Sequence, residues 1–107
     1  MEPVALVRQY YDALDAHDYE TLESILDPAF VQHRPDRTFE GREAFVEFMR
    51  EERPNPDTTH ELAAVVAEGE TVATRGRVLD DGEELFEYAD FFDLEGDRIA
   101  VLETYSR

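Results

Sequence analysis

A carboxylate stands within a row of aromatic residues near the C-terminal end of the chain. In the stretch LFEYADFF, residues 85–92, alternate positions hold Phe86, Tyr88, Asp90 and Phe92. Alternate side chains of a strand share one face, so Asp90 is expected among aromatic rings. Burying an unpaired carboxylate is costly, so such a group shifts its pKa or gains a partner. A dry carboxylate of raised pKa is suited to general acid–base chemistry.

Partners for Asp90 follow from three tight-turn sequences, which are centred on Gly69-Glu70, Asp81-Gly82 and Gly96-Asp97. Counting outward from two-residue turns places Ala73 and Glu103 opposite Asp90, with Arg75 on the diagonal from it. Asp90, Arg75 and Glu103 thus form a polar cluster, and the predicted inner face of the sheet is largely apolar around it. The residues of that face are His60, Leu62, Ala64, Val66, Ala73, Arg75, Arg77, Phe86, Tyr88, Asp90, Phe92, Val101, Glu103 and Tyr105.

Two interpretations of this cluster remain open. In the first, Asp90 and Arg75 form a structural ion pair, and Glu103 points to solvent at a sheet edge. In the second, the three polar groups converge on a small-molecule pocket. Opposed carboxylates would then raise one pKa into the range useful for proton transfer, while Arg75 keeps the other ionised.

Two histidines are further candidates. His33 follows FVQ and either caps the pocket, sharing a proton with substrate, or lies on a surface loop. His60 begins a predicted strand on the pocket side, where it either lines the pocket or is half exposed at the strand end. Their separation matches no metal-binding motif, so no metal site is expected. The chain has no Ser-His-Asp pattern with elbow glycines and no phosphate-binding loop.

The first half of the chain has helical spacing and the second half alternates. Three helices are predicted. The first spans residues 3–15, the second runs from the Asp18 cap to Asp27-Pro28 with Leu26 on its inner face, and the third runs from Gly41-Arg42 to just before RPNP. A short extended segment is predicted at residues 29–33. Strands are predicted at about 59–68, 71–79, 84–94 and 98–106. The expected fold is a single α+β domain over residues 1–107, with the helices on one face of an antiparallel four-strand meander plus one short strand.

Composition excludes several classes of partner. The chain has 107 residues, with 27 Asp plus Glu against 10 cationic residues, all arginine, for a net charge of −17. Such a surface repels nucleic acid and anionic membranes, so neither is expected as a partner. The acidic residues are spread through every segment, which favours a solvated shell suited to high salt, as in an extreme halophile. There is no long apolar run or signal-peptide pattern, so a cytoplasmic location is expected.

The order of these elements, together with YYDALDAHDYETLESILDPAFVQHRPDRTFEGREAFVEFM, AEGETVA and ADFFDLEGDRI, resembles the SnoaL-like polyketide cyclase group of the nuclear transport factor 2-like superfamily. The resemblance spans about residues 4–105 and is most specific in FVQHRP with GREAF and in ADFFDLEGDRI. It implies a cone-shaped fold in which a curved sheet wraps a pocket closed by the helices. It also implies cofactor-independent acid–base chemistry by a pocket Asp, which matches Asp90. His33 matches a histidine of one branch of the group.

The resulting hypothesis is a small enzyme in which Asp90 moves a proton next to a carbonyl or protonates a leaving oxygen. Arg75 would tune Asp90 or hold a substrate oxygen, Glu103 would raise the local pKa, and His33 and Tyr88 would supply hydrogen bonds. The residues expected to contact a small, mostly apolar, oxygenated ligand are Tyr11, Phe30, Phe45, Met49, His60, Tyr88, Phe92 and Tyr105. The alternative is a non-catalytic ligand-binding or dimerisation module with the same cavity.

The opposite face of the predicted sheet is also largely apolar, with Ala63, Val65, Ala67, Val72, Thr74, Val78, Leu85, Ala89, Phe91, Ala100 and Leu102. The helices are expected to cover the pocket face, so this second face requires another cover. Exposed apolar surfaces of that size are usually interfaces, and a two-fold dimer is the commonest solution. A homodimer through the back of the sheet is therefore expected.

Overall fold

The computed structural model describes residues 2–107. Its helices are α1 (Pro3–Asp15), α2 (Tyr19–Ile25) and α3 (Arg42–Glu47), and α3 continues into a π-helical turn, η1 (Phe48–Glu52). Its strands are β1 (Leu26–His33), β2 (Thr38–Glu40), β3 (Thr59–Glu68), β4 (Thr71–Asp80), β5 (Glu83–Glu95) and β6 (Arg98–Ser106). The predicted α+β class is confirmed.

The helices form where local signals place them. α1 begins at Pro3, and the Glu2 carboxylate caps it by accepting two backbone amide hydrogen bonds. α2 begins after Asp18, whose carboxylate accepts a hydrogen bond from the Thr21 amide at 3.2 Å. One predicted bound is wrong, because Leu26 is the first residue of β1 and not part of the inner face of α2.

The sheet is larger than the predicted meander. Six strands hydrogen-bond in the order β2-β1-β6-β5-β4-β3, and β1 runs parallel to β6 while the other neighbours are antiparallel. The prediction of four strands plus one short strand missed β2, because three residues are too few to show an alternating pattern. The pairing of β1 with β6 joins segments from opposite ends of the chain, and no local pattern encodes it.

The tight turns of the C-terminal half are confirmed, but the register beyond them is not. Pairing starts at Glu68↔Thr71, Asp80↔Glu83 and Glu95↔Arg98, so each turn has the predicted two-residue tip. Each strand pair then shifts by one residue at a bulge, which leaves Ala63 in β3, Leu85 in β5 and Ala100 in β6 without a partner in the ladder. A shift of one residue exchanges the two faces of a strand.

The bulges change which residues surround Asp90. Its cross-strand neighbours are Thr74 and Thr104, in place of the predicted Ala73 and Glu103. The predicted outer face is wrong for the same reason, since four of its members are buried on the inner face, namely Val72, Thr74, Val78 and Leu102. We call the side of the sheet that faces the helices the inner face, and the opposite side the outer face.

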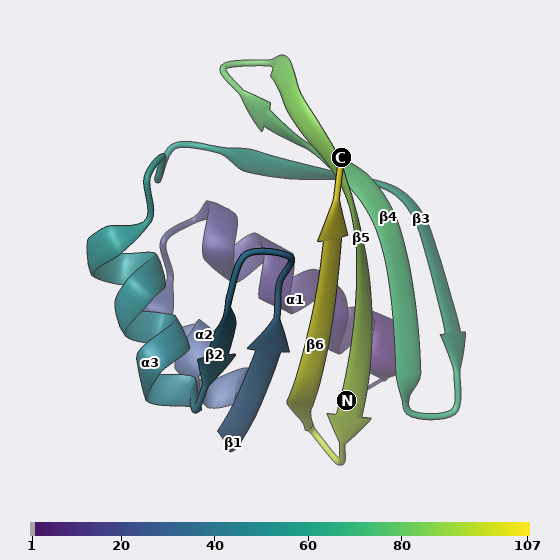
Figure 1. The fold of residues 1–107 in the computed structure, drawn as a ribbon. Helices are drawn as coiled ribbons and strands as arrows, with labels where there is room; N and C mark the ends of the chain where they lie inside the picture. The colour runs from purple at the N-terminus through teal and green to yellow at the C-terminus, as the bar shows by residue number, and fades with distance from the viewer. Residues whose placement is uncertain (1) are drawn as a thin grey trace.

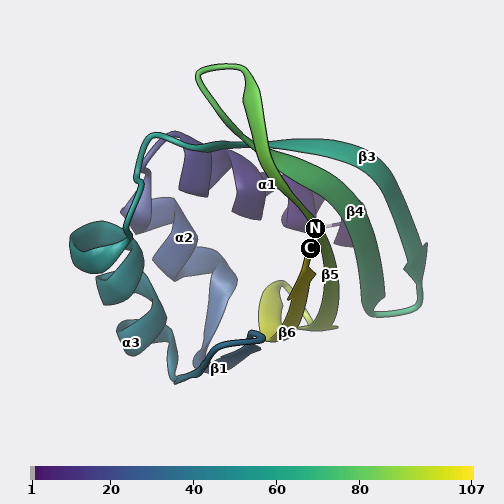
Figure 2. The ribbon, with the colours of Figure 1, turned by 45° about the horizontal axis from the view of Figure 1, so that its top comes forward.

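The sheet curves around the helices, as Figures 1 and 2 show. α1 packs against the inner face of β3 and β4, and α3 packs on β1 and β2. The core between the layers is aromatic and aliphatic, and its fully buried side chains include Phe30, Phe45, Phe92, Leu6, Leu22 and Leu102. Within residues 2–107, none of the helices has both the length and the apolar character that a membrane crossing requires.

Candidate functional site

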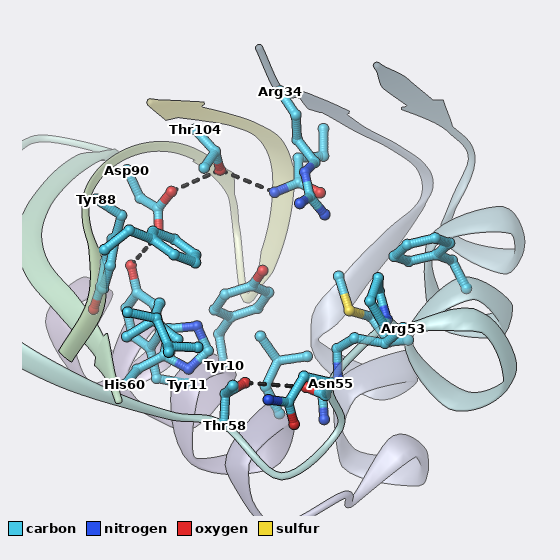
Figure 3. A pocket seen from close by; sticks show the side chains of 18 residues that line it. Tyr10, Tyr11, Arg34, Arg53, Asn55, Thr58, His60, Tyr88, Asp90 and Thr104 are labelled. Carbon is cyan, nitrogen blue, oxygen red and sulfur yellow. Dashed lines mark hydrogen bonds between the residues drawn. The ribbon is translucent and has the colours of Figure 1, made fainter. Parts of the chain in front are cut away.

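A cavity of about 260 Å³ lies between the inner face of the sheet and the helices. Figure 3 shows its walls: Tyr10 and Tyr11 come from α1, Tyr88 and Asp90 from β5, and Thr104 from β6. The volume is slightly below the range of about 300–1,000 Å³ that is usual for ligand pockets, so the cavity fits a small molecule. Aromatic and aliphatic side chains form the larger part of the lining, and polar side chains from several elements interrupt it.

Asp90 is the acidic centre of this cavity. It is only 5% exposed, yet both of its carboxylate oxygens accept short hydrogen bonds. The Tyr11 hydroxyl donates to Oδ2 at 2.5 Å, and the Thr104 hydroxyl donates to Oδ1 at 2.6 Å. The three residues come from α1, β5 and β6, so the tertiary fold assembles a site that no local segment contains. The groups in direct contact with this carboxylate are hydroxyls, and not the predicted arginine.

The oxygen atoms of the Thr104 and Tyr11 hydroxyls each accept a hydrogen bond from another side chain. The Gln32 side-chain amide donates to Thr104 Oγ1 at 2.9 Å. The Thr74 hydroxyl lies 2.7 Å from the Tyr11 hydroxyl and donates to it, because the single Tyr11 proton is directed at Asp90. Two chains of hydrogen bonds therefore point toward Asp90, and such chains strengthen the bond at their end. In this arrangement both carboxylate oxygens of Asp90 act as acceptors.

Burial raises the pKa of Asp90 above its ordinary value. The hydrogen bonds from Thr104 and Tyr11 oppose that shift, as do the positive fields of His60 and Arg34. The pKa of Tyr11 is also raised, by burial first and by the neighbouring Asp90 second. The proton of the Tyr11–Asp90 pair therefore resides on the tyrosine, and the charge resides on the carboxylate when the pair is ionised.

Tyr10 points its hydroxyl into the middle of the cavity (Figure 3). No group among residues 2–107 hydrogen-bonds to this hydroxyl, although the side chain is buried against Phe92 at a ring-centroid distance of 5.3 Å. Burial and Asp90 raise the pKa of Tyr10, so the hydroxyl stays protonated and remains a donor. The Tyr10 hydroxyl is therefore a free donor in a cavity that also contains the Asp90 carboxylate.

A histidine–carboxylate pair forms another part of the wall. His60 Nδ1 lies 2.7 Å from Asp15 Oδ1, and the His60 backbone amide donates to Asp15 Oδ2 at 2.9 Å. The imidazole packs between the rings of Tyr11 and Tyr88, at centroid distances of 5.2 and 5.5 Å. Because Asp15 accepts from Nδ1, the neutral tautomer leaves Nε2 free to accept a proton.

Five of the predicted site residues line the cavity: Tyr11, Met49, His60, Tyr88 and Asp90. Three predicted ligand contacts lie deeper in the core instead. Phe30 packs on Phe45 at a centroid distance of 5.0 Å, and Phe92 lies beneath Tyr10 and Tyr11. They are wrong as ligand contacts because other core side chains pack over them and separate them from the cavity, although they lie on the correct face.

Four other predicted site residues do not lie at the cavity: the bulges carry Arg75, Glu103 and Tyr105 to the outer face, and His33 is exposed at a strand end. Arg75 is exposed and pairs with Ala89 in the ladder. The carboxylate of Glu103 accepts a hydrogen bond from Tyr105, which is 53% exposed and packs on Phe91. His33 is exposed at the end of β1, where its Nδ1 lies 3.4 Å from Thr38 Oγ1. None of these four side chains lines the cavity described here.

The polar residues that the sequence reasoning missed are Thr74, Thr104, Gln32, Asn55, Thr58 and Tyr10, together with two arginines, Arg34 and Arg53. Gln32 lies beside the singled-out His33, and alternation along β1 puts one of the two on each face. A register with bulges would have identified both threonines, but nothing in the turn sequences indicates a bulge. Among the described residues, no three His, Asp or Glu side chains converge as ligands for a metal ion.

Comparison with known proteins agrees with this architecture. The model of the SnoaL-like domain matches residues 7–102. The chain belongs to the SnoaL-like domain family. A comparison with curated protein sequences found no match.

Solved structures of the same fold carry several different descriptions. An NTF2-like protein of unknown function from Cytophaga hutchinsonii has a TM-score of 0.87 at 19% identity, covering 100% of this chain and 91% of its own. A proposed ketosteroid isomerase from Kribbella flavida has a TM-score of 0.86 at 19% identity, covering 96% and 76%. An LEH-like epoxide hydrolase from M. tuberculosis has a TM-score of 0.81 at 17% identity, covering 98% and 82%. At these identities the likeness shows the NTF2-like fold alone.

Proposed function

We propose that this SnoaL-like protein is a small proton-transfer enzyme that acts, without a cofactor, on a small, mostly apolar molecule bearing a carbonyl group. The observation that supports it is the buried Asp90 carboxylate, which two hydroxyl donors orient at the wall of a cavity with a largely aromatic and aliphatic lining. Perturbed carboxyl groups in clefts are typical of catalytic acids and bases. The description of one structural neighbour as a ketosteroid isomerase fits the same reaction class.

The chemistry follows from the positions of two groups. Ionised Asp90 takes a proton from a carbon next to the carbonyl, so that the C–H bond breaks, an O–H bond forms on the carboxyl group, and the electron pair moves to the carbonyl oxygen. The Tyr10 hydroxyl donates a hydrogen bond to the enolate oxygen, where the negative charge develops. The raised pKa of Asp90 makes it a stronger base than an exposed carboxylate.

The enolate then has two outcomes that the same groups support. Asp90 can return its proton at a different carbon, which gives an isomerisation. The enolate carbon can instead attack a second carbonyl of the same molecule, which closes a ring, and the new alkoxide takes up the proton. His60, held by Asp15, is a second proton carrier on the cavity wall for either outcome.

The test is deuterium exchange at a carbon acid. A cyclic ketone with activated C–H bonds, such as 2-tetralone, is incubated with the protein in D₂O, and exchange next to the carbonyl is followed by NMR. We expect catalysed exchange by the parent and background exchange by Asp90→Asn, with Glu103→Gln as a matched outer-face control that retains activity. Equal exchange by parent and Asp90→Asn would contradict the role of Asp90.

The alternative function is binding without turnover. It is favoured by the fact that both Asp90 oxygens already accept hydrogen bonds in the free chain, so the carboxylate is stable as it stands. A binding module would bind ketones and phenols in the cavity, yet exchange no protons faster than the background reaction. The deuterium experiment therefore separates the two functions.

A further inference from the structure

Two of the ten arginines line the cavity, in a chain whose net charge is −17. Arg34 comes from the connection between β1 and β2, and Arg53 follows η1 directly. Figure 3 shows both on the wall that lies across the cavity from Asp90. The cavity therefore has a carboxylate on β5 and two guanidinium groups on its other walls, each from a separate segment.

Arg53 has an unsatisfied guanidinium. It donates one hydrogen bond, from an Nη to the Pro56 carbonyl oxygen at 2.7 Å, while its Nε is buried without a partner. Within the described residues it forms no ion pair, although the chain holds 27 acidic residues. A part-buried cation without a counterion is costly, and a buried donor without an acceptor adds to that cost.

Arg34 is also weakly compensated. Its Nε lies 3.6 Å from the Asp36 carboxylate, whose side chain is well exposed and which also contacts Arg37 at 3.8 Å. Exposed ion pairs of this kind contribute little. The guanidinium additionally lies 6.0 Å from the centroid of the Phe39 ring. Nothing in these contacts prevents Arg34 from binding an anion inside the cavity.

One feature connects both arginines to the cavity centre, and a second concerns Arg53 alone. Their positive fields act on the Tyr10 hydroxyl, whose pKa they lower against the larger effects of burial and Asp90. The segment that delivers Arg53 leaves α3 through the π-helical turn η1, which also brings Met49 to the cavity. π-Helical turns are rare and occur frequently at functional sites.

We propose that Arg34 and Arg53 form a carboxylate-binding subsite, so that the ligand of this cavity is a small organic acid. Which group of the ligand reacts at Asp90 rests on the function proposed above, whereas binding of its carboxylate by the two arginines does not depend on that function. A guanidinium fork matches a carboxylate in geometry and charge, and it supplies the acceptor that Arg53 Nε lacks. A single negative charge suits the site better than a phosphate dianion, because the acidic surface repels a dianion more strongly.

The probes are small ring acids with their neutral amides: benzoate, phenylacetate and cyclohexanecarboxylate, each paired with its carboxamide. Binding to the full chain is measured by NMR titration at constant ionic strength. We expect at least one acid to bind about tenfold more tightly than its amide, the size of effect typical of hydrogen bonds to charged groups. Added salt should weaken binding of the acid and leave binding of the amide unchanged.

Variants assign the preference to the subsite. Arg53→Gln and Arg34→Gln should each reduce the acid-over-amide ratio by about fivefold or more, whereas Arg53→Lys should retain part of it. Arg50→Gln and Arg37→Gln are the matched controls, because each changes an exposed arginine of the same segment that does not line the cavity. The controls should keep the full ratio.

Three outcomes would overturn the proposal. These are equal binding of acids and amides, absence of binding by all acids at millimolar concentration, and an unchanged ratio in both Gln variants despite a lowered melting temperature. The last outcome would mean that the arginines only stabilise the fold. Deuterium exchange by the parent protein is independent of all three, so failure of the subsite and failure of the acid–base function are distinguishable.

Discussion

At the scale of single residues, Asp90 is tolerated among aromatic rings because hydroxyl groups replace its water. Tyr11 and Thr104 each donate one short hydrogen bond to it, and neither group carries a charge. A neutral donor stabilises a carboxylate without cancelling its basicity, whereas a paired arginine would lower its pKa strongly. This difference favours a working base over a structural ion pair.

Replacing Asp90 with Asn should preserve or increase stability at neutral pH. The folded pKa of Asp90 is raised above its ordinary value of 3.8, so the folded state prefers the protonated form. The stability from this preference is present in full below pH 3.8 and is lost as the pH rises through the folded pKa. Asn never ionises, so the difference in unfolding free energy between variant and parent should grow with pH over that window. Urea titrations at several pH values measure it, and a large loss of stability in Asp90→Asn at neutral pH would contradict the prediction.

Loss of the hydroxyl should lower the unfolding free energy at Tyr11 but not at Tyr10, the adjacent tyrosine of α1. Tyr11→Phe removes a donor from a buried carboxylate and should cost about 1.5–3 kcal/mol of unfolding free energy. Tyr10→Phe removes a hydroxyl that makes no hydrogen bond within residues 2–107, so its stability should match the parent while exchange activity falls. Denaturant unfolding and deuterium exchange measure the two effects. Equal stability of both variants would contradict the hydrogen-bond assignment.

At the scale of elements, bulges decide which face of each strand reaches the cavity. Leu85 and Ala100 stand outside the ladders that flank Asp90, and they bring Thr74 and Thr104 to its sides. The same strands bend around the helices, as expected where bulges raise local twist and curvature. At Gly76, β4 packs closely against its two neighbouring strands, because the Glu61 carbonyl of β3 and the Tyr88 ring of β5 lie against it.

Gly76→Ala should therefore destabilise the sheet. A Cβ at this position would lie 2.3 Å from the Glu61 carbonyl oxygen and 2.7 Å from the Tyr88 hydroxyl. Overpacking of this kind costs about 1–3 kcal/mol, and a clash with backbone belongs at the upper end. Thermal unfolding of Gly76→Ala measures the loss.

Tyr88→Phe provides the control, because it removes a buried hydroxyl that has no partner among the described groups. Alone it should be neutral or stabilising. Combined with Gly76→Ala it should recover only part of the loss, since the Glu61 carbonyl oxygen remains. Full recovery in the double variant would show that the side chain and not the backbone limits this position.

At the scale of the whole molecule, the net charge and the outer face of the sheet bear on stability and on assembly. The net charge of −17 is distributed over the entire chain, so its self-repulsion acts on the folded state as a whole. The outer face of the sheet mixes exposed apolar side chains, such as Phe91 at 45% and Val66 at 66%, with charged ones such as Arg75. It is less apolar than the sequence count predicted.

The melting temperature should rise with salt. The Debye length is about 30 Å at 0.01 M and about 3 Å at 1 M, so molar salt screens repulsion that low salt leaves in place. Differential scanning calorimetry in sodium chloride at these two concentrations measures the rise. A flat profile would contradict the interpretation of the acidic surface as an adaptation to high salt.

We propose that two copies associate through the outer face, where Phe91 and Tyr105 pack on each other and remain about half exposed. A single charge at the centre of such an interface should disrupt it. Light scattering at micromolar concentration in molar salt should show a dimer for the parent and a monomer for Phe91→Glu. A monomeric parent would exclude this assembly under those conditions.

The sequence by itself determined the helices, the turn tips, the burial of Asp90 and the family resemblance. Each of these depends on local signals: Pro3 and Asp18 at helix starts, Gly at two-residue turns, and alternation in LFEYADFF. Such signals act within a few residues, so they can be recognised before the chain is folded.

Only the tertiary structure decided which groups meet at Asp90. Tyr11, Thr104 and Gln32 come from α1, β6 and β1, and their contacts depend on single-residue bulges that leave no mark in the turn sequences. Because a strand has a period of two, one extra residue moved Arg75 and Glu103 to the outer face and brought Thr74 and Thr104 inward. The position of a site residue is therefore as uncertain as the register of its strand, and packing against the helices settles that register.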